Sequence, residues 1–200
     1  GRIVSGGKDG TLRIWSRGAD GKWQSEVLEG HSDWVRCLQV LLDGRIVSGN
    51  RDGTLCIWSR GVDGKWQSEV LRGHSGSVNC LQVLPDGRIV SGGGDGTLRI
   101  WSRGVDGAWQ SEVLVGHSGI VWCLQVLPDE RIVSGGNDGT LRVWSRGADG
   151  AWQSEVLRGH ESSVNCLQVL SDGRIVSGGD DGTIRIWSRG VDGAWQSEVL

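Results

Sequence analysis

The sequence contains no methionine, phenylalanine or tyrosine, and only 2 of its 200 residues are proline. It also lacks any apolar run close to the roughly 20 residues that a membrane-spanning helix needs, so no membrane association is expected. No charge of one sign dominates, because 21 Lys and Arg residues stand against 24 Asp and Glu, a formal net charge of −3. This balance gives no electrostatic reason to expect nucleic acid as a partner.

The sequence is repetitive, and its composition is rich in glycine and tryptophan, with 35 glycines and 12 tryptophans. Two runs recur with a constant step of 43 residues. The run Arg-Ile-Val-Ser-Gly begins at Arg2, Arg45, Arg88, Arg131 and Arg174. The run Trp-Gln-Ser-Glu-Val-Leu begins at Trp23, Trp66, Trp109, Trp152 and Trp195. No linker interrupts them, so we predict a single array, with a partial unit at 1–29 and complete units at 30–72, 73–115, 116–158 and 159–200.

Each unit consists of short segments rich in β-formers, separated largely by Asp-Gly turns. In the unit 30–72 these segments are 35–40, 45–48, 54–58 and 66–71. None has helical periodicity, so the predicted fold class is all-β and each complete unit is a four-stranded antiparallel meander. Leu55 and Ile57 lie on one face and Trp58 on the other, so neighbouring sheets are expected to stack. Radial stacking of 43-residue units predicts a β-propeller with about five blades in this segment.

The phase of the repeat predicts 19 strands, because the chain opens at a second strand and ends at a fourth. The first blade is therefore expected to lack its innermost strand. Propellers have about 4–8 complete blades, and five with one incomplete would close poorly. We expect the segment to belong to a longer propeller, which the Met-free start favours, or to a ring completed by further copies of the repeat in another chain.

Three features recur at fixed places in the units. A Gly-His pair precedes the first strand at Gly30-His31, Gly73-His74, Gly116-His117 and Gly159-His160. A turn aspartate follows the second strand at Asp9, Asp52, Asp95, Asp138 and Asp181. A tryptophan lies near the end of the third strand at Trp15, Trp58, Trp101, Trp144 and Trp187. With these features the whole chain resembles the WD-repeat (WD40-type) β-propeller family, although Ser replaces the family's Asp after each of those tryptophans.

The resemblance implies hydrogen-bonded tetrads, in which His bridges the turn Asp and a strand Ser, and the Ser contacts the Trp N–H. The four sets are His31, Ser48, Asp52, Trp58; His74, Ser91, Asp95, Trp101; His117, Ser134, Asp138, Trp144; and His160, Ser177, Asp181, Trp187. The first unit has Ser5, Asp9 and Trp15 but no preceding His. Because an unpaired buried indole N–H or imidazole costs roughly 1–3 kcal/mol, such sets would hold loops in place.

His, Ser and Asp also fit the catalytic triad of a hydrolase. The set recurs in every complete unit, whereas an active site is singular, so we interpret it as structural and predict that the chain is not an enzyme. Metal and cofactors are not expected, since the histidines lie 43 residues apart, no Cys-x-x-Cys occurs, and no helix follows the glycine-rich turn 92–96. The cysteines fit small core residues, with Cys56 replacing an Arg of the other units, and reduced thiols favour an intracellular, cytoplasmic location.

Positions that differ among the units fall mainly on one rim of the predicted propeller, the rim that carries the fourth-to-first and second-to-third strand connections. Trp and Arg, the residue types enriched at interface hot spots, gather there. The predicted partner-binding residues are Lys8, Asp33, Trp34, Arg36, Arg51, Asn79, Ile120, Trp122, Asn165 and Asp180. The alternative for Trp34 is packing against the loop of its own blade.

These observations favour a non-catalytic scaffold that binds a protein or peptide through one rim, as WD-repeat propellers generally do. The alternative is a structural, self-assembling module in which stacking of the repeats builds a larger complex. An enzyme would need a polar cluster that occurs only once, and the repeats offer none.

Overall fold

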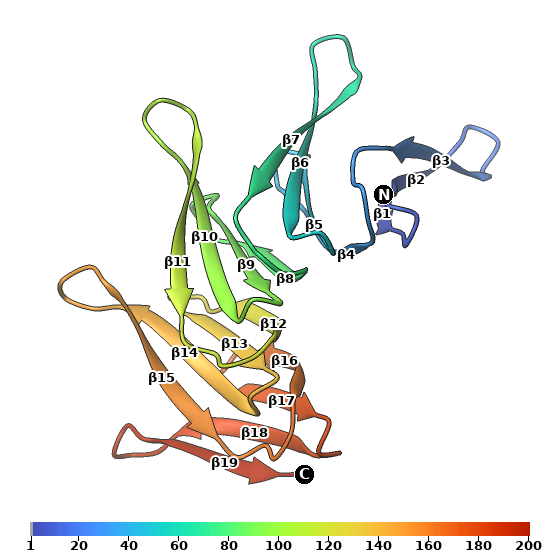
Figure 1. Cartoon of the computed structure of the whole chain (residues 1–200). Helices are drawn as coiled ribbons and strands as arrows, with labels where there is room; N and C mark the ends of the chain where they lie inside the picture. The colour runs from blue at the N-terminus through green and yellow to red at the C-terminus, as the bar shows by residue number, and fades with distance from the viewer. Residues whose placement is uncertain (1) are drawn as a thin grey trace.

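A computed structural model describes residues 2–200, which form nineteen strands in five antiparallel sheets (Figure 1). The first sheet has three strands, in the order β1-β2-β3, and each of the others has four, in chain order. The predicted all-β fold and the 43-residue repeat of four-stranded meanders are therefore confirmed. The missing strand of the first blade is the innermost one, as expected.

The strands occupy equivalent places in successive blades. The innermost strands are β4 (Val35–Val40), β8 (Val78–Val83), β12 (Val121–Val126) and β16 (Val164–Val169). The second strands are β1 (Ile3–Gly6), β5 (Ile46–Asn50), β9 (Ile89–Gly93), β13 (Ile132–Gly136) and β17 (Ile175–Gly179). The third strands are β2 (Leu12–Arg17), β6 (Thr54–Arg60), β10 (Thr97–Arg103), β14 (Thr140–Arg146) and β18 (Ile184–Arg189). The outer strands are β3 (Trp23–Leu28), β7 (Trp66–Arg72), β11 (Trp109–Val115), β15 (Trp152–Arg158) and β19 (Trp195–Val199).

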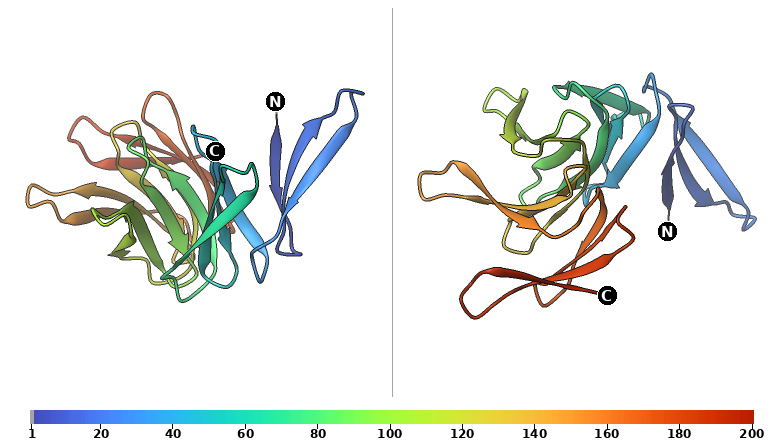
Figure 2. Two further views of the ribbon diagram at one scale, coloured as in Figure 1. Left: turned by 90° about the horizontal axis from the view of Figure 1, so that it is seen from above. Right: turned by 60° about the horizontal axis from the view of Figure 1, so that its bottom comes forward.

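The five blades follow one another along an open arc, from β1–β3 at one end to β16–β19 at the other (Figures 1 and 2). The innermost strands β4, β8, β12 and β16 contact one another in sequence, so they line the inner side of this arc. Antiparallel order places the connections β4–β5 and β6–β7 at one rim and the connections β5–β6 and β7–β8 at the other. We call the second of these the variable rim, because most residues that differ among the repeats lie in its loops or at the strand ends beside them.

The apolar core lies between the blades and repeats at each junction. Between the third and fourth blades, Leu98 and Ile100 of β10 pack with Ile132 of β13 and Trp144 of β14. All four side chains are buried, and burial of each such side chain stabilises the fold by about 1.5–3 kcal/mol. The approach of the sheets is close enough to require glycine at Gly92, where an added Cβ would lie 2.6 Å from Cγ1 of Val121 in the next blade.

The register of each innermost strand shifts by one residue at a β-bulge. In β4 the shift falls between Val35 and Cys37, so Arg36 is the extra residue. The same shift brings the extra residue to Asn79, Trp122 and Asn165 in the following blades. Bulges change the direction of a side chain, and here they lie at the end of the strand next to the variable rim.

Candidate functional site

The best-formed polar clusters are the buried sets of His, Ser, Asp and Trp. In the third blade, Nε1–H of Trp101 donates to Oγ of Ser91 at 2.9 Å, and Nε2 of His74 lies 2.8 Å from the same Oγ. Nδ1 of His74 lies 3.0 Å from Oδ2 of Asp95. His117 and His160 lie in the same way in the fourth and fifth blades, with Nε2 2.8 Å from Ser134 and Ser177 respectively.

These contacts determine which atoms of the set carry protons and donate hydrogen bonds. Oγ of Ser91 accepts the indole proton of Trp101, so its own O–H is free to donate to Nε2 of His74, and Nδ1–H of His74 then donates to Asp95. The imidazole is neutral in this arrangement. Burial lowers the pKa of His74 and His117, although the neighbouring carboxylates oppose the shift.

The aspartates of these sets are held ionised. Burial on its own would raise the pKa of Asp138, but hydrogen bonds from the Ser118 backbone N–H, His117 and Thr140 outweigh it and lower the pKa to about 2. The acceptor at the end of each chain of hydrogen bonds is thus a carboxylate, which strengthens the bond from the imidazole.

The distances within each set match those of a Ser-His-Asp triad, but the serines have no access to a substrate. Ser91 and Ser134 are 0% exposed, and their hydroxyl oxygens already accept a tryptophan N–H. A nucleophilic serine needs an exposed hydroxyl and space for an acyl group beside it. The geometry therefore suits a structural role, in which each set joins one loop to two strands.

The second blade departs from this pattern. His31 and Trp58 both contact Ser48, but across residues 2–200 no hydrogen bond joins His31 to Asp52. The hydroxyl of Ser32 donates to Asp52 instead, and Nδ1 of His31 lies 3.6 Å from Sγ of Cys56. The bridge between His31 and Asp52 that the resemblance implies is therefore absent. This is the one complete blade in which Cys replaces Arg, so the changed contacts of the His31 imidazole accompany the loss of the Arg side chain.

A cysteine beside a histidine is also a possible nucleophile, and the surroundings of Cys56 argue against that use. Its side chain is 1% exposed. Burial, followed by the charge of Asp52, raises the pKa of Cys56 to about 11, so the thiolate is scarce at neutral pH.

The first blade contains the incomplete set. Nε1–H of Trp15 donates to Oγ of Ser5 at 2.9 Å, but both side chains are less buried than their counterparts. An open cavity of about 440 Å³ lies beside them, lined in part by Ser5, Lys8, Asp9 and Arg13. In the other blades a histidine of the preceding loop occupies the corresponding place.

Lys8, Trp34 and Arg51, three residues of the variable rim, form one cluster. Nζ of Lys8 lies 4.4 Å from the ring centroid of Trp34, and the guanidinium of Arg51 lies 4.9 Å from it. Lys8 comes from the β1–β2 turn of the first blade, whereas Arg51 and Trp34 belong to the second. Asp33 accepts the backbone N–H of Trp34 at 2.7 Å and thereby fixes the loop. Both cations are exposed and the indole is half-buried, so the cluster presents charge beside an aromatic surface.

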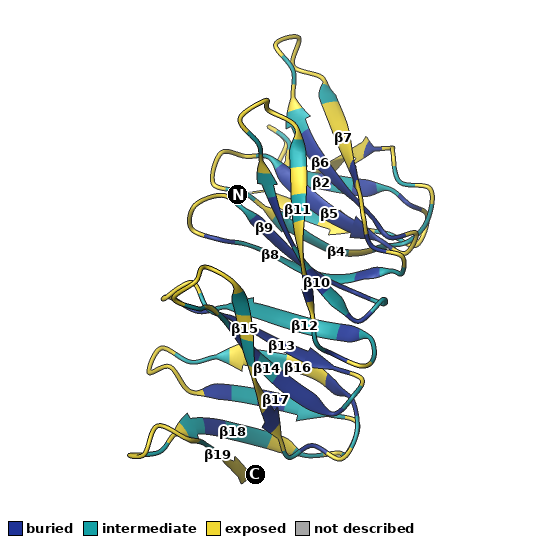
Figure 3. Ribbon diagram, turned by 60° about the vertical axis from the view of Figure 1, so that its left-hand side comes forward, coloured by how far each residue is buried: buried dark blue, intermediate teal, exposed yellow. Residues whose placement is uncertain are grey.

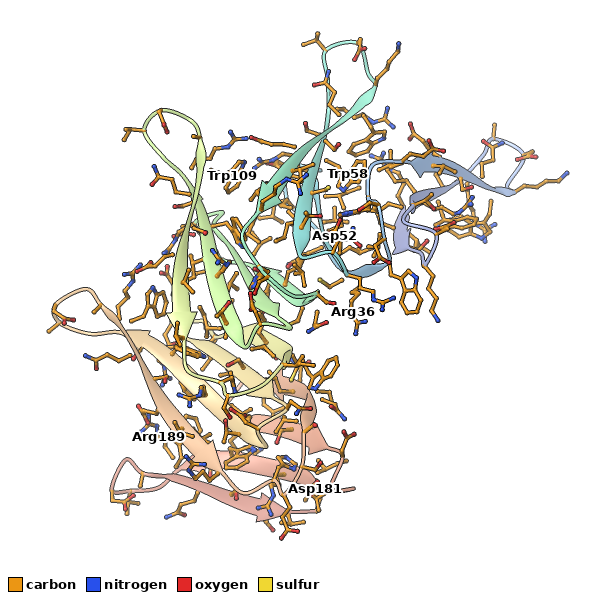
Figure 4. The ribbon with its side chains drawn as sticks, viewed as in Figure 1. Arg36, Asp52, Trp58, Trp109, Asp181 and Arg189 are labelled. Carbon is orange, nitrogen blue, oxygen red and sulfur yellow. The ribbon has the colours of Figure 1, made fainter. Side chains whose placement is uncertain are left out.

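A second pair lies at the bulges of the innermost strands. The guanidinium of Arg36 in β4 lies 5.9 Å from the ring centroid of Trp122 in β12, so the two side chains extend past the intervening β8. Figure 4 shows Arg36 and Asp52 on the same side of the molecule, away from the hairpin tips that follow β6 and β10.

The remaining predicted partner-binding residues are engaged with neighbouring protein groups. Asn79 donates to the backbone oxygen of Val121 at 3.1 Å, which links two innermost strands. Asn165 donates to Asp180 within the fifth blade. The backbone oxygen of Ile120 accepts the N–H of Asn137 at 2.8 Å. The side-chain amides of Asn79 and Asn165 are thus engaged within the protein, whereas Ile120 makes its contact through the backbone.

Two features lay outside the sequence reasoning. Outer-strand glutamates bridge the blades, as where Glu69 accepts Nε1–H of Trp109 at 3.0 Å and pairs with Arg103 at 2.6 Å. On the opposite rim, Pro85, Pro128 and Leu170 help to line an open hollow of about 510 Å³ at the inner side of the arc. The constant spacing of Glu, Arg and Trp in the repeats could have predicted the glutamate bridges between blades. No sequence pattern predicts the hollow on the opposite rim.

Among residues 2–200, no group of three or more His, Cys, Asp or Glu side chains is arranged to hold a metal ion. No helix in that range is long and apolar enough to cross a bilayer.

Comparison with known proteins agrees with the repeat structure. The family described as "WD domain, G-beta repeat" matches residues 1–16, 22–59, 65–102, 109–145 and 152–188. A stretch of 36 residues is 50% identical to "Protein SEC13 homolog" of Homo sapiens, and it covers 18% of this chain and 11% of that protein. The family matches lie on all five blades and cover most of the chain. The chain therefore belongs to the WD-repeat family of β-propeller proteins.

Proposed function

We propose that this chain is a non-catalytic scaffold that binds a protein or peptide through its variable rim. The observation that carries the proposal is the cluster of Lys8 and Arg51 against Trp34, in which two blades contribute to one exposed surface. Trp and Arg dominate interface hot spots because they combine a large contact area with directional hydrogen bonds. Membership of the WD-repeat family supports an interaction role in general terms.

The variable rim of the first two blades presents charges of both signs beside an aromatic surface. Lys8, Arg36 and Arg51 are exposed there, and so are Asp9, Glu29 and Asp52. A partner segment that carries both basic and acidic side chains would complement these charges, and the order of its charges would set the direction in which it binds.

The non-catalytic part of the proposal is supported by burial of the possible nucleophiles. The serines of the complete sets are nearly inaccessible, and Cys56 combines 1% exposure with a raised pKa. An intracellular location belongs to the same proposal and is supported by the five free thiols.

The experiment uses a random peptide display library selected against the folded chain. Selected peptides are expected to contact the cations and aromatic rings of this rim, so Trp34→Ala, Arg36→Ala, Arg51→Ala and Trp122→Ala are each expected to weaken their binding. Leu42→Ala and Lys65→Ala on the opposite rim serve as matched controls, since both side chains are exposed. Equal loss of binding from changes on both rims would refute the assignment of the variable rim.

A structural role in a self-assembling complex is the second candidate. It is favoured by the near identity of the internal blade junctions, which lets any blade pack against any other, and it does not depend on the variable rim.

A further inference from the structure

The second blade differs from the later blades at the turn that joins β5 to β6. The last residue of β5 is Asn50, and the same repeat position holds glycine in the other units, at Gly7, Gly93, Gly136 and Gly179. β5 and β6 are mostly buried, as their dark colour in Figure 3 shows, and Asn50 is 0% exposed. A side chain larger than that of glycine is therefore present inside this blade.

The later blades have no room for a side chain at this position. An added Cβ at Gly93 would overlap Nδ1 of His74 and lie 2.5 Å from Oδ1 of Asp95. An added Cβ at Gly136 would lie 2.5 Å from Nδ1 of His117. A Cβ atom keeps a greater distance than this from any non-bonded atom. The hydrogen bond between His and Asp in these sets therefore requires glycine at the end of the second strand.

Asn50 thus accounts for the altered contacts of the second blade. Nδ1 of His31 lies 3.6 Å from Sγ of Cys56, and across residues 2–200 no hydrogen bond joins the imidazole to Asp52. Nδ2 of Asn50 is itself buried without a hydrogen-bond partner in that range. Because a buried amide nitrogen without a partner destabilises a fold, a gain in stability does not explain the presence of Asn50.

The aspartate that His31 does not reach is exposed. Asp52 is exposed on the variable rim, whereas the side chains of Asp95 and Asp138 are 11% and 10% exposed. All three aspartates belong to blades that have a neighbouring blade on either side. The difference in exposure therefore comes from the turn of the second blade itself.

The hydrogen bonds of the Asp52 carboxylate leave one acceptor position open. Oδ1 accepts the backbone N–H of Thr54 at 2.9 Å and its Oγ1–H at 2.7 Å. Within residues 2–200, Oδ2 accepts only the Oγ–H of Ser32, at 2.5 Å. In the third blade the same oxygen of Asp95 accepts two hydrogen bonds. Because a carboxylate oxygen has two lone pairs, Oδ2 of Asp52 can accept one further hydrogen bond from a bound molecule.

The charge of Asp52 is not neutralised by a cation of the chain. Among the described residues Asp52 takes part in no ion pair, and the guanidinium of the adjacent Arg51 lies 4.9 Å from the ring centroid of Trp34. The backbone N–H of Arg51 donates to the backbone oxygen of Trp34 at 2.9 Å, and Ser32 of the same loop donates to Asp52. The carboxylate therefore lies on the same surface as the cluster of Arg51 and Trp34.

We propose that Asp52 is a partner-binding residue that accepts a hydrogen bond from a basic side chain of the bound protein or peptide. This role rests on the proposed function of the variable rim. Asn50 is the positioning residue, because its side chain keeps His31 away from Asp52. A single open acceptor position does not allow the bidentate pairing of a guanidinium with a carboxylate, so lysine and arginine of the partner are expected to bind with similar affinity.

Chemical labelling of the free chain tests the exposed carboxylate without a partner. A water-soluble carbodiimide with an amine probe, followed by mass spectrometry, is expected to modify Asp52 well before Asp95 and Asp138. Asn50→Gly is expected to restore the contact with His31 and to slow the labelling of Asp52 to the rate of Asp138. Equal labelling of the three aspartates in the unaltered chain would overturn the proposal.

Binding is tested with a peptide, selected on the folded chain, whose affinity Trp34→Ala lowers. Asp52→Asn is expected to lower its affinity about fivefold in calorimetry at low ionic strength, and less at high salt. Asn50→Gly is expected to have the same effect. Asp181→Asn is the matched control: its side chain is 8% exposed, so the variant is expected to lose stability but not affinity.

Changes in the peptide identify the group that pairs with Asp52. Alanine in place of one basic residue of the peptide is expected to lower affinity for the unaltered chain and to cause no further loss with Asp52→Asn. Exchange of lysine and arginine at that residue is expected to leave the affinity unchanged. Circular dichroism checks that each protein variant is folded.

The results distinguish the role of Asp52 from the function of the rim. Loss of affinity with Trp34→Ala but not with Asp52→Asn would overturn the role of Asp52 and leave the rim as the binding surface. Peptides that depend on Trp34 but carry no basic residue would overturn it as well. If no selected peptide depends on Trp34, the proposed function fails and the role of Asp52 fails with it.

Discussion

Removal of one buried hydroxyl tests whether the His-Ser-Asp-Trp sets stabilise the blades. Oγ of Ser91 contacts Nε1 of Trp101 and Nε2 of His74, and both of those side chains are buried. Ser91→Ala therefore leaves an indole N–H and an imidazole nitrogen without partners. At roughly 1–3 kcal/mol for each of these two unsatisfied buried groups, we expect the free energy of unfolding to fall by about 2–6 kcal/mol.

The first blade provides a matched control. Ser5 occupies the same repeat position, but it is exposed, has no histidine partner and contacts only the half-buried Trp15. Ser5→Ala removes one hydrogen bond that water can replace, so a loss of about 0.5–1 kcal/mol is expected. Urea unfolding at neutral pH, followed by tryptophan fluorescence and circular dichroism together, measures both variants. Equal losses for the two would show that the bonds to Ser91 are not what stabilises the blade.

Four other outcomes are expected. Cys56→Arg restores the arginine of the other blades and, through a hydrogen bond and stacking on Trp58, is expected to raise the free energy of unfolding by about 1 kcal/mol in urea titrations. Glu130 has φ 66° at a position where the other units have glycine, so Glu130→Gly is expected to raise the free energy of unfolding by about 1 kcal/mol. Gly87→Ala, at φ 86°, is expected to lower the free energy of unfolding. Because the folded-state pKa of His74 is lowered from 6.5 and that of Asp95 from 3.8, urea titrations across pH should show stability lost in two stages, below about pH 6.5 and again below 3.8. Iodoacetamide followed by mass spectrometry should label the exposed Cys166 well before Cys123, whose pKa burial raises to about 12.

The strand order and blade number followed from the sequence because every blade repeats the same turn chemistry. Asp43 and Gly44 illustrate this: the carboxylate accepts the N–H of Arg45 at 3.0 Å, and the glycine adopts φ 85°. Local rules of this kind need no knowledge of distant residues. The absence of an innermost strand from the first blade could also be predicted, because the repeat pattern shows that the sequence opens at a second strand.

The details of the site could not be read from single units. The contact of Lys8 with Trp34 joins two blades, and that of Arg36 with Trp122 extends past an intervening strand, so both depend on the angle between sheets. The altered contacts of His31 accompany the replacement of arginine by the shorter Cys56, whose sulfur lies 3.6 Å from Nδ1 of the ring. A motif predicts which residues are near one another; the packing between motifs decides which of them touch.

The near identity of the blade junctions has a consequence for how the chain reaches its folded state. A strand such as β9 finds almost the same side chains on β4, β12 or β16 as on its proper neighbour β8, so side-chain chemistry discriminates poorly between correct and exchanged pairings. Short turns between consecutive strands favour the local partner, since closing a longer loop costs more conformational entropy. Correct folding thus depends on chain connectivity, and conditions that slow hairpin closure or crowd many chains together are expected to produce molecules with strands traded between blades.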